Sequence, residues 1–188
     1  MPSQENVGLS TEQETGLVAR AKEGDETAIS QLYRQYAPGI YGYIAGRVGD
    51  SATAQDLTSE VFLRALEGLP QFEYRGIPFS AWLYRIAHDR IADHFRRQGR
   101  RPTVPLEDEL LPAQDGIVQV ADDHLRVEQV GKAIERLSAE QHQVILLRFV
   151  AGFKLKEIAY VMDKSTAAVK MLQLRALTRL RQWVVQTG

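Results

Sequence analysis

The chain has 188 residues, of which 44% are hydrophobic and 25% are charged, and it contains no cysteine. This composition is ordinary for a folded globular protein, and the length suits one large domain or two small ones. The absence of cysteine excludes disulfides, thiolate zinc sites and cysteine nucleophiles. No apolar run is long enough to span a bilayer, and residues 1–14 lack a signal-peptide pattern, so we expect a cytoplasmic protein without membrane insertion.

The net charge of −1 conceals blocks of opposite sign along the chain. Residues 1–70, 71–101, 102–124 and 125–188 carry net charges of −5, +4, −6 and +6 respectively. Two basic segments separated by an acidic spacer indicate two contacts with a polyanion such as nucleic acid. Chance clustering of surface charge is the alternative, and the charge pattern alone does not decide between them.

Apolar residues recur mostly at helical spacing, and strand-like alternation is almost absent, so the sequence predicts an all-α fold. Residues 102–123 contain no Lys or Arg, three prolines and no sustained periodicity, which is typical of a flexible linker. This acidic linker divides the chain into two small helical domains. We expect an N-terminal helical bundle over residues 10–101 and a C-terminal helical domain over residues 124–186.

In the N-terminal part, the stretch LPQFEYRGIP at residues 69–78 reads as a loop that carries Phe72, Tyr74 and Arg75 beside a glycine and a proline. Aromatic side chains and an arginine on a loop are suited to stacking on unpaired bases. Alternatively, Phe72 and Tyr74 simply cover the end of the helical bundle.

The loop is followed by a predicted helix, FSAWLYRIAHDRIADHFRR, at residues 79–97. Its apolar stripe of Leu83, Ala87, Ile91 and Phe95 predicts packing in a bundle, with Trp82 at the edge of the stripe. The helix runs into a basic tail, which we expect to lie against a polyanion. The tail consists of Arg96, Arg97, Arg100 and Arg101.

In the C-terminal part, residues 153–183 contain two helical stripes separated by the polar residues Asp163, Lys164 and Ser165. Ser165 is placed to cap the second helix, and Asp163 is a residue type that tolerates the left-handed conformation. Two helices joined by such a short turn predict a helix-turn-helix, whose second helix enters the major groove of DNA. Ser138 and Gln141 have the spacing of a capping box ahead of a supporting helix, to which we assign Val144, Leu147, Phe149 and Val150.

Several residues of the second helix lie outside its apolar stripe and are candidates for DNA contact. Small side chains at the tip allow close approach, lysine and arginine can bind phosphate or guanine, and glutamine can pair with adenine. An αα-hairpin with a solvated basic face is the structural alternative. The candidates are Thr166, Ala167, Lys170, Gln173, Leu174 and Arg175.

The segments DLTSEVFLRAL (56–66), FSAWLYRIAHDRIADHFRR (79–97) and EIAYVMDKSTAAVKMLQLRAL (157–177), taken together and in this order, resemble bacterial RNA polymerase sigma factors of the extracytoplasmic-function (ECF) type. The resemblance extends from about Leu17 to Trp183. It implies a non-enzymatic subunit without a cofactor, whose partners are core RNA polymerase and promoter DNA, duplex at the −35 element and opened at the −10 element. An anti-sigma factor is a common further partner in the family.

The resemblance also assigns roles to individual residues. Residues 54–66 match the region that grips the core polymerase, with a candidate binding face of Asp56, Glu60, Phe62 and Leu63. The loop 70–78 and the helix 79–97 match the region that opens and reads the −10 element, through Phe72, Tyr74, Arg75, Trp82, Arg96, Arg97 and Arg100. The helix-turn-helix matches the reader of the −35 element, through Ser165, Thr166, Ala167, Lys170, Gln173, Leu174 and Arg175.

Two other classes of protein fit parts of the sequence. A stand-alone helix-turn-helix regulator with a helical sensor domain would bind duplex DNA by itself and with dimer symmetry. A metal-dependent nuclease would use His88, Asp89, Asp93 and His94, which lie close together on one predicted helix, although these residues equally suit ion pairs with neighbouring arginines.

Overall fold

We describe a computed structural model of the protein, in which residues 11–99, 134 and 136–186 are described. The described residues form helices, turns and loops without any strand, which confirms the predicted all-α fold. They make two compact units, one built from the helices up to His94 and the other built mainly from the helices after Ser138. The predicted linker at residues 102–123 lies outside the described residues.

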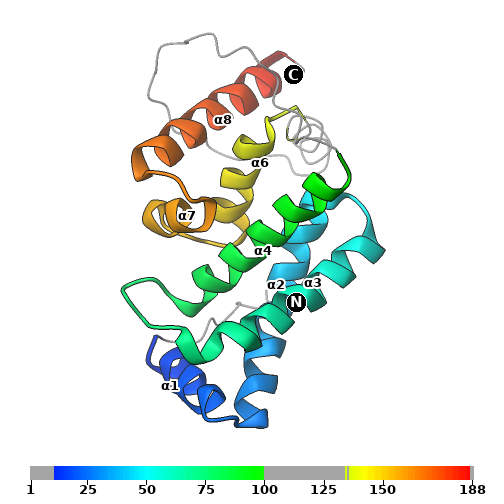
Figure 1. The fold of residues 1–188 in the computed structure, drawn as a ribbon. Helices are drawn as coiled ribbons and strands as arrows, with labels where there is room; N and C mark the ends of the chain where they lie inside the picture. Colours follow the sequence, from blue (N-terminus) through cyan, green and yellow to red (C-terminus); the bar gives the residue numbers. More distant parts are fainter. Residues whose placement is uncertain (1–10, 100–133, 135, 187–188) are drawn as a thin grey trace, which may run out of the picture. The chain divides into compact units, whose positions relative to one another are not determined.

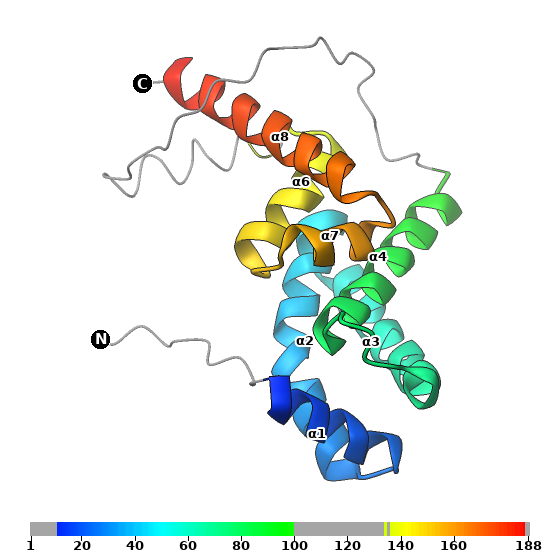
Figure 2. The same cartoon turned by 90° about the vertical axis from the view of Figure 1, so that its left-hand side faces the viewer.

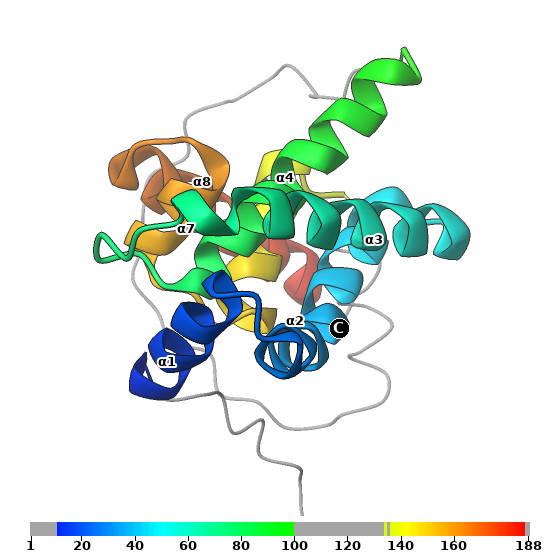
Figure 3. The same ribbon diagram turned by 60° about the horizontal axis from the view of Figure 1, so that its bottom comes forward.

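The first unit is a small helical bundle. Its elements are α1 (Thr11–Lys22), α2 (Glu26–Val48), α3 (Ser51–Gly68), the short 3₁₀-helix η1 (Leu69–Gln71) and α4 (Phe79–Arg97). Helices α1 and α2 form a hairpin, as Figure 3 shows, and α3 packs along α2 (Figure 1).

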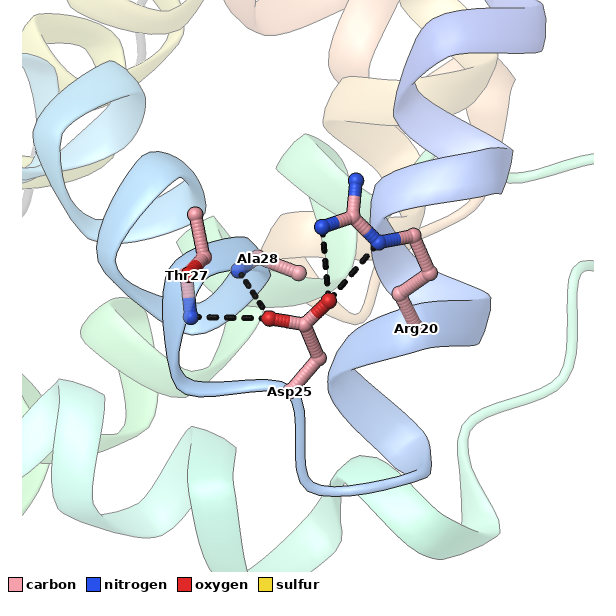
Figure 4. A network of polar contacts seen from close by, with 4 residues as sticks. All are labelled: Arg20, Asp25, Thr27 and Ala28. Atoms are coloured by element: carbon pink, nitrogen blue, oxygen red, sulfur yellow. Dashed lines mark hydrogen bonds and ion pairs between the residues drawn. The ribbon is translucent and has the colours of Figure 1, made fainter.

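Polar side chains and glycines set the ends of α2 and α3. Asp25 caps the start of α2, since its Oδ1 accepts hydrogen bonds from the backbone nitrogens of Thr27 at 2.9 Å and Ala28 at 3.1 Å (Figure 4). Gly49 ends α2 with a φ of 75°, a conformation that glycine adopts without steric cost. Asp50 then caps α3 through the backbone nitrogen of Thr53. These caps satisfy amide groups that would otherwise lack partners at helix starts.

The core of the first unit is aliphatic at its centre and aromatic at one end. Ile40, Ile44, Val61 and Leu83 are fully buried, and they come from α2, α3 and α4. The predicted stripe of α4 is confirmed at Leu83, Ala87 and Ile91, whereas Phe95 is partly exposed. Burial of this stripe leaves the opposite face of α4 at the surface of the unit.

The second unit consists of α6 (Ala139–Ile145), the π-helical turn η2 (Leu146–Val150), α7 (Leu155–Met162) and α8 (Thr166–Gln186). Figure 2 shows the long α8 leaving the tight turn that follows α7. The predicted capping box at the start of α6 is confirmed, with Ser138 and Gln141 bonded reciprocally. Asp163 adopts a φ of 54°, and the hydroxyl of Ser165 accepts a hydrogen bond from the backbone nitrogen of Ala168 at 3.1 Å. The predicted turn and cap are thus both present.

Valines, leucines and isoleucines from all the helices of the second unit fill its core, and Val144, Leu147, Ile158 and Val169 are fully buried. The expectation that Phe149 and Val150 support this core is wrong, because they are 59% and 76% exposed. Both residues belong to the π-helical turn, in which the backbone nitrogen of Ala151 bonds the carbonyl of Leu146 five residues earlier. Even at the α-helical spacing of about 100° per residue, Phe149 and Val150 fall roughly 140° and 120° around the helix from Val144, and both therefore lie off its core face.

A polar side chain also ties α6 to α8 within the second unit. The buried Oε1 atom of Gln141 accepts hydrogen bonds from the backbone nitrogen of Ser138 at 3.2 Å and from Nη1 of Arg179 at 3.0 Å. One amide therefore caps the start of α6 and holds α8 beside it. In the part of the chain that the structure describes, no helix is both long enough and apolar enough to cross a membrane.

Candidate functional site

The loop between η1 and α4 is a predicted contact site for unpaired bases, and the structure buries the first of its two aromatic residues. The Phe72 side chain is only 8% exposed, and its ring centroid lies 5.5 Å from that of Phe79 and 5.0 Å from that of Trp82. The structure therefore places Phe72 in the aromatic end of the core, where it covers the bundle. Trp82 is half-buried in the same cluster.

The middle of the loop is exposed and polar. Tyr74 is 48% exposed, and Gly76 provides a bend with a φ of 74°. The guanidinium of Arg75 pairs with the carboxylate of Glu73, with an Nη2–Oε2 distance of 2.6 Å. Of the two loop aromatics proposed to stack on bases, Tyr74 alone presents a large exposed surface in this structure.

An open hollow of about 310 Å³ lies between α1 and this loop. Its lining is largely apolar and includes two carboxylates and one ammonium group. The lining residues are Glu14, Thr15, Val18, Ala19, Lys22, Phe72, Glu73, Tyr74 and Phe79.

Two polar side chains of α1 hold the segment that borders the hollow. The carboxylate of Glu14, although the residue is only 6% exposed, accepts hydrogen bonds from the Tyr36 hydroxyl and from the backbone nitrogens of Phe79 at 3.3 Å and Ser80 at 3.4 Å. The ammonium of Lys22 donates a hydrogen bond to the carbonyl oxygen of Phe72. Burial, together with the bond to the Glu14 carboxylate, raises the pKa of Tyr36. Sequence reasoning did not identify Glu14 or Lys22, because their partners lie far along the chain.

The outer end of α4 carries the predicted basic tail. Arg96 and Arg97 are exposed on its last turn, whereas Arg100 and Arg101 lie outside the described residues. The two described arginines therefore stand where a basic surface was expected. Upstream on the same helix, Asp93 forms an ion pair with Arg90. Within the described ranges, no three histidine, aspartate or glutamate side chains are arranged to hold a metal ion.

The predicted acidic and apolar face of α3 is formed. Asp56 and Glu60 are exposed, and Leu63 is 62% exposed on the same side of the helix. Phe62 is partly buried, with its ring centroid 4.6 Å from that of Tyr33 on α2. Tyr33 and Leu66, which sequence reasoning missed, are also exposed. They border a small apolar hollow between α2 and α3, so the apolar area is larger than predicted.

The start of α8 presents the tip of the helix-turn-helix. Thr166, Ala167, Lys170 and Leu174 are exposed on one face of the helix, and the exposed Ser165 precedes them. Met171 and Leu177, which sequence reasoning left out, are also exposed there.

The other two predicted base readers lie at the flanks of this face. Gln173 and Arg175 are partly buried. Arg175 lies five positions after Lys170, which places their side chains about 140° apart around the helix. The two basic groups therefore address different sides of whatever α8 contacts.

The turn of the helix-turn-helix is held by an ion pair. Nζ of Lys164 lies 2.8 Å from Oε1 of Glu140 at the start of α6. Lys164 is thus engaged within the unit, which leaves Lys170 as an exposed lysine at the tip of α8.

Comparison with known proteins places both units in one family. Residues 32–101 match the Sigma-70 region 2 family, and residues 133–182 match the Sigma-70, region 4 family. The chain is 34% identical over 178 residues to the ECF RNA polymerase sigma factor SigD of Mycobacterium tuberculosis, covering 92% of this chain and 84% of that protein. It is 41% identical over 169 residues to the ECF RNA polymerase sigma factor BldN of Streptomyces coelicolor, covering 87% of this chain but only 63% of that protein.

Solved structures agree with the fold. CnrH, in complex with the cytosolic domain of CnrY, matches with a TM-score of 0.69 at 22% identity, covering 93% of this chain and 99% of that one. The sigma factor RpoE from Bartonella quintana, in complex with the anti-sigma factor NepR, matches with a TM-score of 0.62 at 22% identity, covering 82% and 95%. At this identity the two structures bear on the fold alone. On the two matched regions and the identity to SigD, the chain belongs to the ECF family of RNA polymerase sigma factors.

Proposed function

We propose that this protein binds core RNA polymerase and directs promoter-specific transcription initiation. The observation that carries the proposal is the presence, on one chain of the family, of a helix-turn-helix with an exposed tip and a separate helical bundle with an exposed polar loop. The protein then supplies promoter recognition, while the core polymerase performs the phosphodiester chemistry. A stand-alone regulator would need no polymerase-binding surface, and the acidic and apolar face of α3 favours the sigma-factor function.

The chain divides its task between the two units. Residues 10–101 bind the core polymerase and act at the −10 element, residues 102–123 connect the units, and residues 124–186 read the −35 element. The family matches at residues 32–101 and 133–182 support this division. We place the protein in the cytoplasm, where RNA polymerase works.

At the −10 element, the loop before α4 captures an extruded base and the basic end of α4 follows the DNA backbone. Opening and unstacking a base step costs a few kcal/mol, which a pocket for the extruded base offsets. The open hollow beside Tyr74 supports this assignment, since it is apolar enough to receive a base face. The buried Phe72 serves as the floor of the site, and the contact surface is that of Tyr74 and Arg75.

At the −35 element, α8 enters the major groove with its first turn. The exposed residues Thr166 and Ala167 permit close approach, and Lys170 reaches phosphate or a guanine edge. Phosphate contacts from both units make the affinity depend on salt.

An anti-sigma factor is a further partner that fits this chain. The apolar area formed by Tyr33, Phe62, Leu63 and Leu66 is a surface that such a protein would cover. The RpoE structure, solved with an anti-sigma factor, supports the expectation at the level of the fold.

A run-off transcription assay tests the proposed function directly. Core polymerase is mixed with this protein and with fragments of the genome it comes from, and transcript starts are mapped. We expect new start sites that share two sequence boxes and that require both components. If the protein neither joins the core polymerase nor changes where transcription starts, the proposal fails. If it binds duplex DNA specifically by itself, the stand-alone regulator is favoured.

A further inference from the structure

Helix α1 contacts both ends of the loop that precedes α4, through one acidic and one basic side chain. We infer that Glu14 and Lys22 are positioning residues for promoter opening: they fix the two ends of the loop so that its exposed middle is held ready for DNA. The inference rests on the proposed function and deepens it. Glu14 is buried and Lys22 is exposed, and the charged groups of both bond to the protein's own backbone.

Lys22 holds the entry to the loop. Its ammonium donates to the carbonyl oxygen of Phe72, the residue whose ring packs against those of Phe79 and Trp82. The backbone nitrogen of Phe72 bonds in turn to the carbonyl of Leu69, which ends η1. Phe72 is thus held in two ways: α1 binds its backbone carbonyl, and the aromatic cluster packs against its side chain.

Glu14 holds the exit from the loop. Its two carboxylate oxygens meet the backbone nitrogens of Phe79 and Ser80, the first residues of α4. These amides lack partners within α4, and a carboxylate at a helix start is also favoured by the helix dipole. The hydroxyl of Tyr36 donates to the same carboxylate and fixes its orientation. A side chain from α1 therefore performs the capping that the residues before α4 do not perform.

Fixing both ends of residues 73–78 lowers the entropy that the loop loses when it binds an opened strand. Ordering the backbone of one residue corresponds to roughly a tenfold factor in an equilibrium constant. Releasing either anchor should therefore slow opening of the promoter by about tenfold without altering the loop's own sequence. The slowing of promoter opening should depend on the contacts that the loop makes with DNA, and not on the stability of the bundle.

The test compares variants of the full chain bound to core polymerase, on a promoter found by the run-off assay. Lys22→Met keeps the aliphatic stem and removes the ammonium, Lys22→Arg restores a donor, and Glu14→Gln removes the charge at the start of α4. Glu12→Gln is the matched control, because Glu12 is an exposed glutamate on the same helix. The rate of open-complex formation is measured on duplex promoter and on promoter with a mismatched, pre-opened −10 element.

We expect Lys22→Met and Glu14→Gln to slow opening of the duplex about tenfold, with a smaller loss on the pre-opened promoter. Lys22→Arg should recover most of the rate, and Glu12→Gln should match the unmodified protein. A double variant with Tyr74→Ala tests whether Lys22 acts through the loop. If it does, Lys22→Met should have little further effect on the opening rate once the Tyr74 side chain is removed. A general loss of stability would not show this dependence.

Two results would overturn the inference. One is opening rates for Lys22→Met and Glu14→Gln equal to that of Glu12→Gln, and the other is an unchanged Lys22→Met effect in the Tyr74→Ala background. If Glu14→Gln lowers the melting temperature strongly, the Lys22 series decides alone, since Lys22 is exposed and its replacement leaves the core intact. Failure of the proposed function would give a different result, because the unmodified protein would then not support transcription initiation by the core polymerase.

Discussion

The hydroxyl of Tyr84 on α4 occupies the space that a side chain at Gly39 on α2 would need. A Cβ atom on Gly39 would come within 2.8 Å of that oxygen, closer than such atoms approach in folded proteins. Tyr84 is itself buried and packs against Tyr43, with 5.3 Å between ring centroids. We therefore expect Gly39→Ala to push the ring against its neighbours and to lower the free energy of unfolding by about 1–3 kcal/mol.

A second glycine of α2 provides the matched control. Gly42 is exposed in the middle of the same helix, and a Cβ there meets nothing within 4 Å. Gly42→Ala should raise the free energy of unfolding by about 0.5–1 kcal/mol, because alanine favours the helix more than glycine does. Urea denaturation of both variants measures the two changes. Equal shifts of the same sign would contradict the proposed contact with Tyr84.

Stability in acid should depend on Asp25. The Arg20 guanidinium and the backbone N–H groups of Ala28 and Thr27 hold the pKa of the Asp25 carboxyl below its usual value (Figure 4). A group whose pKa is lower in the folded state stabilises the fold above its unfolded pKa of about 3.9 and ceases to do so as the pH falls through the folded value. Asp25→Asn should therefore melt at a lower temperature than the unmodified protein at pH 7, and the difference should begin to shrink near pH 4 and disappear once the pH is below the lowered pKa of Asp25.

The comparison of aspartate with asparagine isolates the charge, because both residues cap helices well. Arg20→Gln removes the partner, whose Nη2 lies 2.6 Å from Oδ2 of Asp25. In that background the melting-temperature difference between aspartate and asparagine should shrink at pH 7. A difference that persists unchanged at low pH would show that the cap, and not the ion pair, carries the effect.

Local patterns in the sequence predicted most of the fold correctly. The turn after α7 follows from neighbouring residues, since a left-handed Asp163 and a capping Ser165 each act within a few positions. The stripe of α4 follows from helical periodicity, and the exposure of Asp56 and Glu60 follows from the same argument on α3.

What the sequence could not predict depends on contacts between distant residues or on a change of helix type. Periodicity does not place Glu14 opposite the amide of Phe79, 65 positions later, or turn the Phe72 ring inward. The π-helical turn at Leu146–Val150 is a change of helix type that the sequence pattern does not indicate. The exposure of Phe149 and Val150, in contrast, agrees with α-helical spacing from Val144, so assigning them to the core was an error of periodicity. The assignment of Phe72 to a DNA-contacting surface remains a prediction, and its burial favours a structural role.

The acidic face of α3 leads to a prediction about binding to the polymerase. Asp56→Lys with Glu60→Lys should weaken association with core polymerase by roughly tenfold or more, because like charges across an interface cost several kcal/mol. The fold should be unaffected, since both side chains are exposed. Glu12→Lys with Glu23→Lys, at two exposed positions on and just after α1, makes the same change in total charge and serves as the control. Equal affinities of all three proteins in a competition assay would remove this face from the proposed interface.

The exposed tip of α8 leads to a prediction about promoter choice. Lys170→Ala with Arg175→Ala should weaken selection of promoters by their upstream element, by about 1–3 kcal/mol for each lost base contact. Because the two side chains lie about 140° apart, the single variants should differ. We expect the exposed Lys170 to contact DNA inside the major groove and Arg175 to contact DNA at the edge of the groove. Lys156→Ala, at an exposed lysine on α7, has the same change in charge as each single variant and is their control. Transcription from promoters with intact and scrambled −35 elements separates these effects. If Lys170 reads a base, Lys170→Ala reduces the ratio of transcription from the intact promoter to transcription from the scrambled one. If Lys170 contacts phosphate alone, transcription from both promoters falls by the same factor. That second result would show that Lys170 does not read a base of the −35 element.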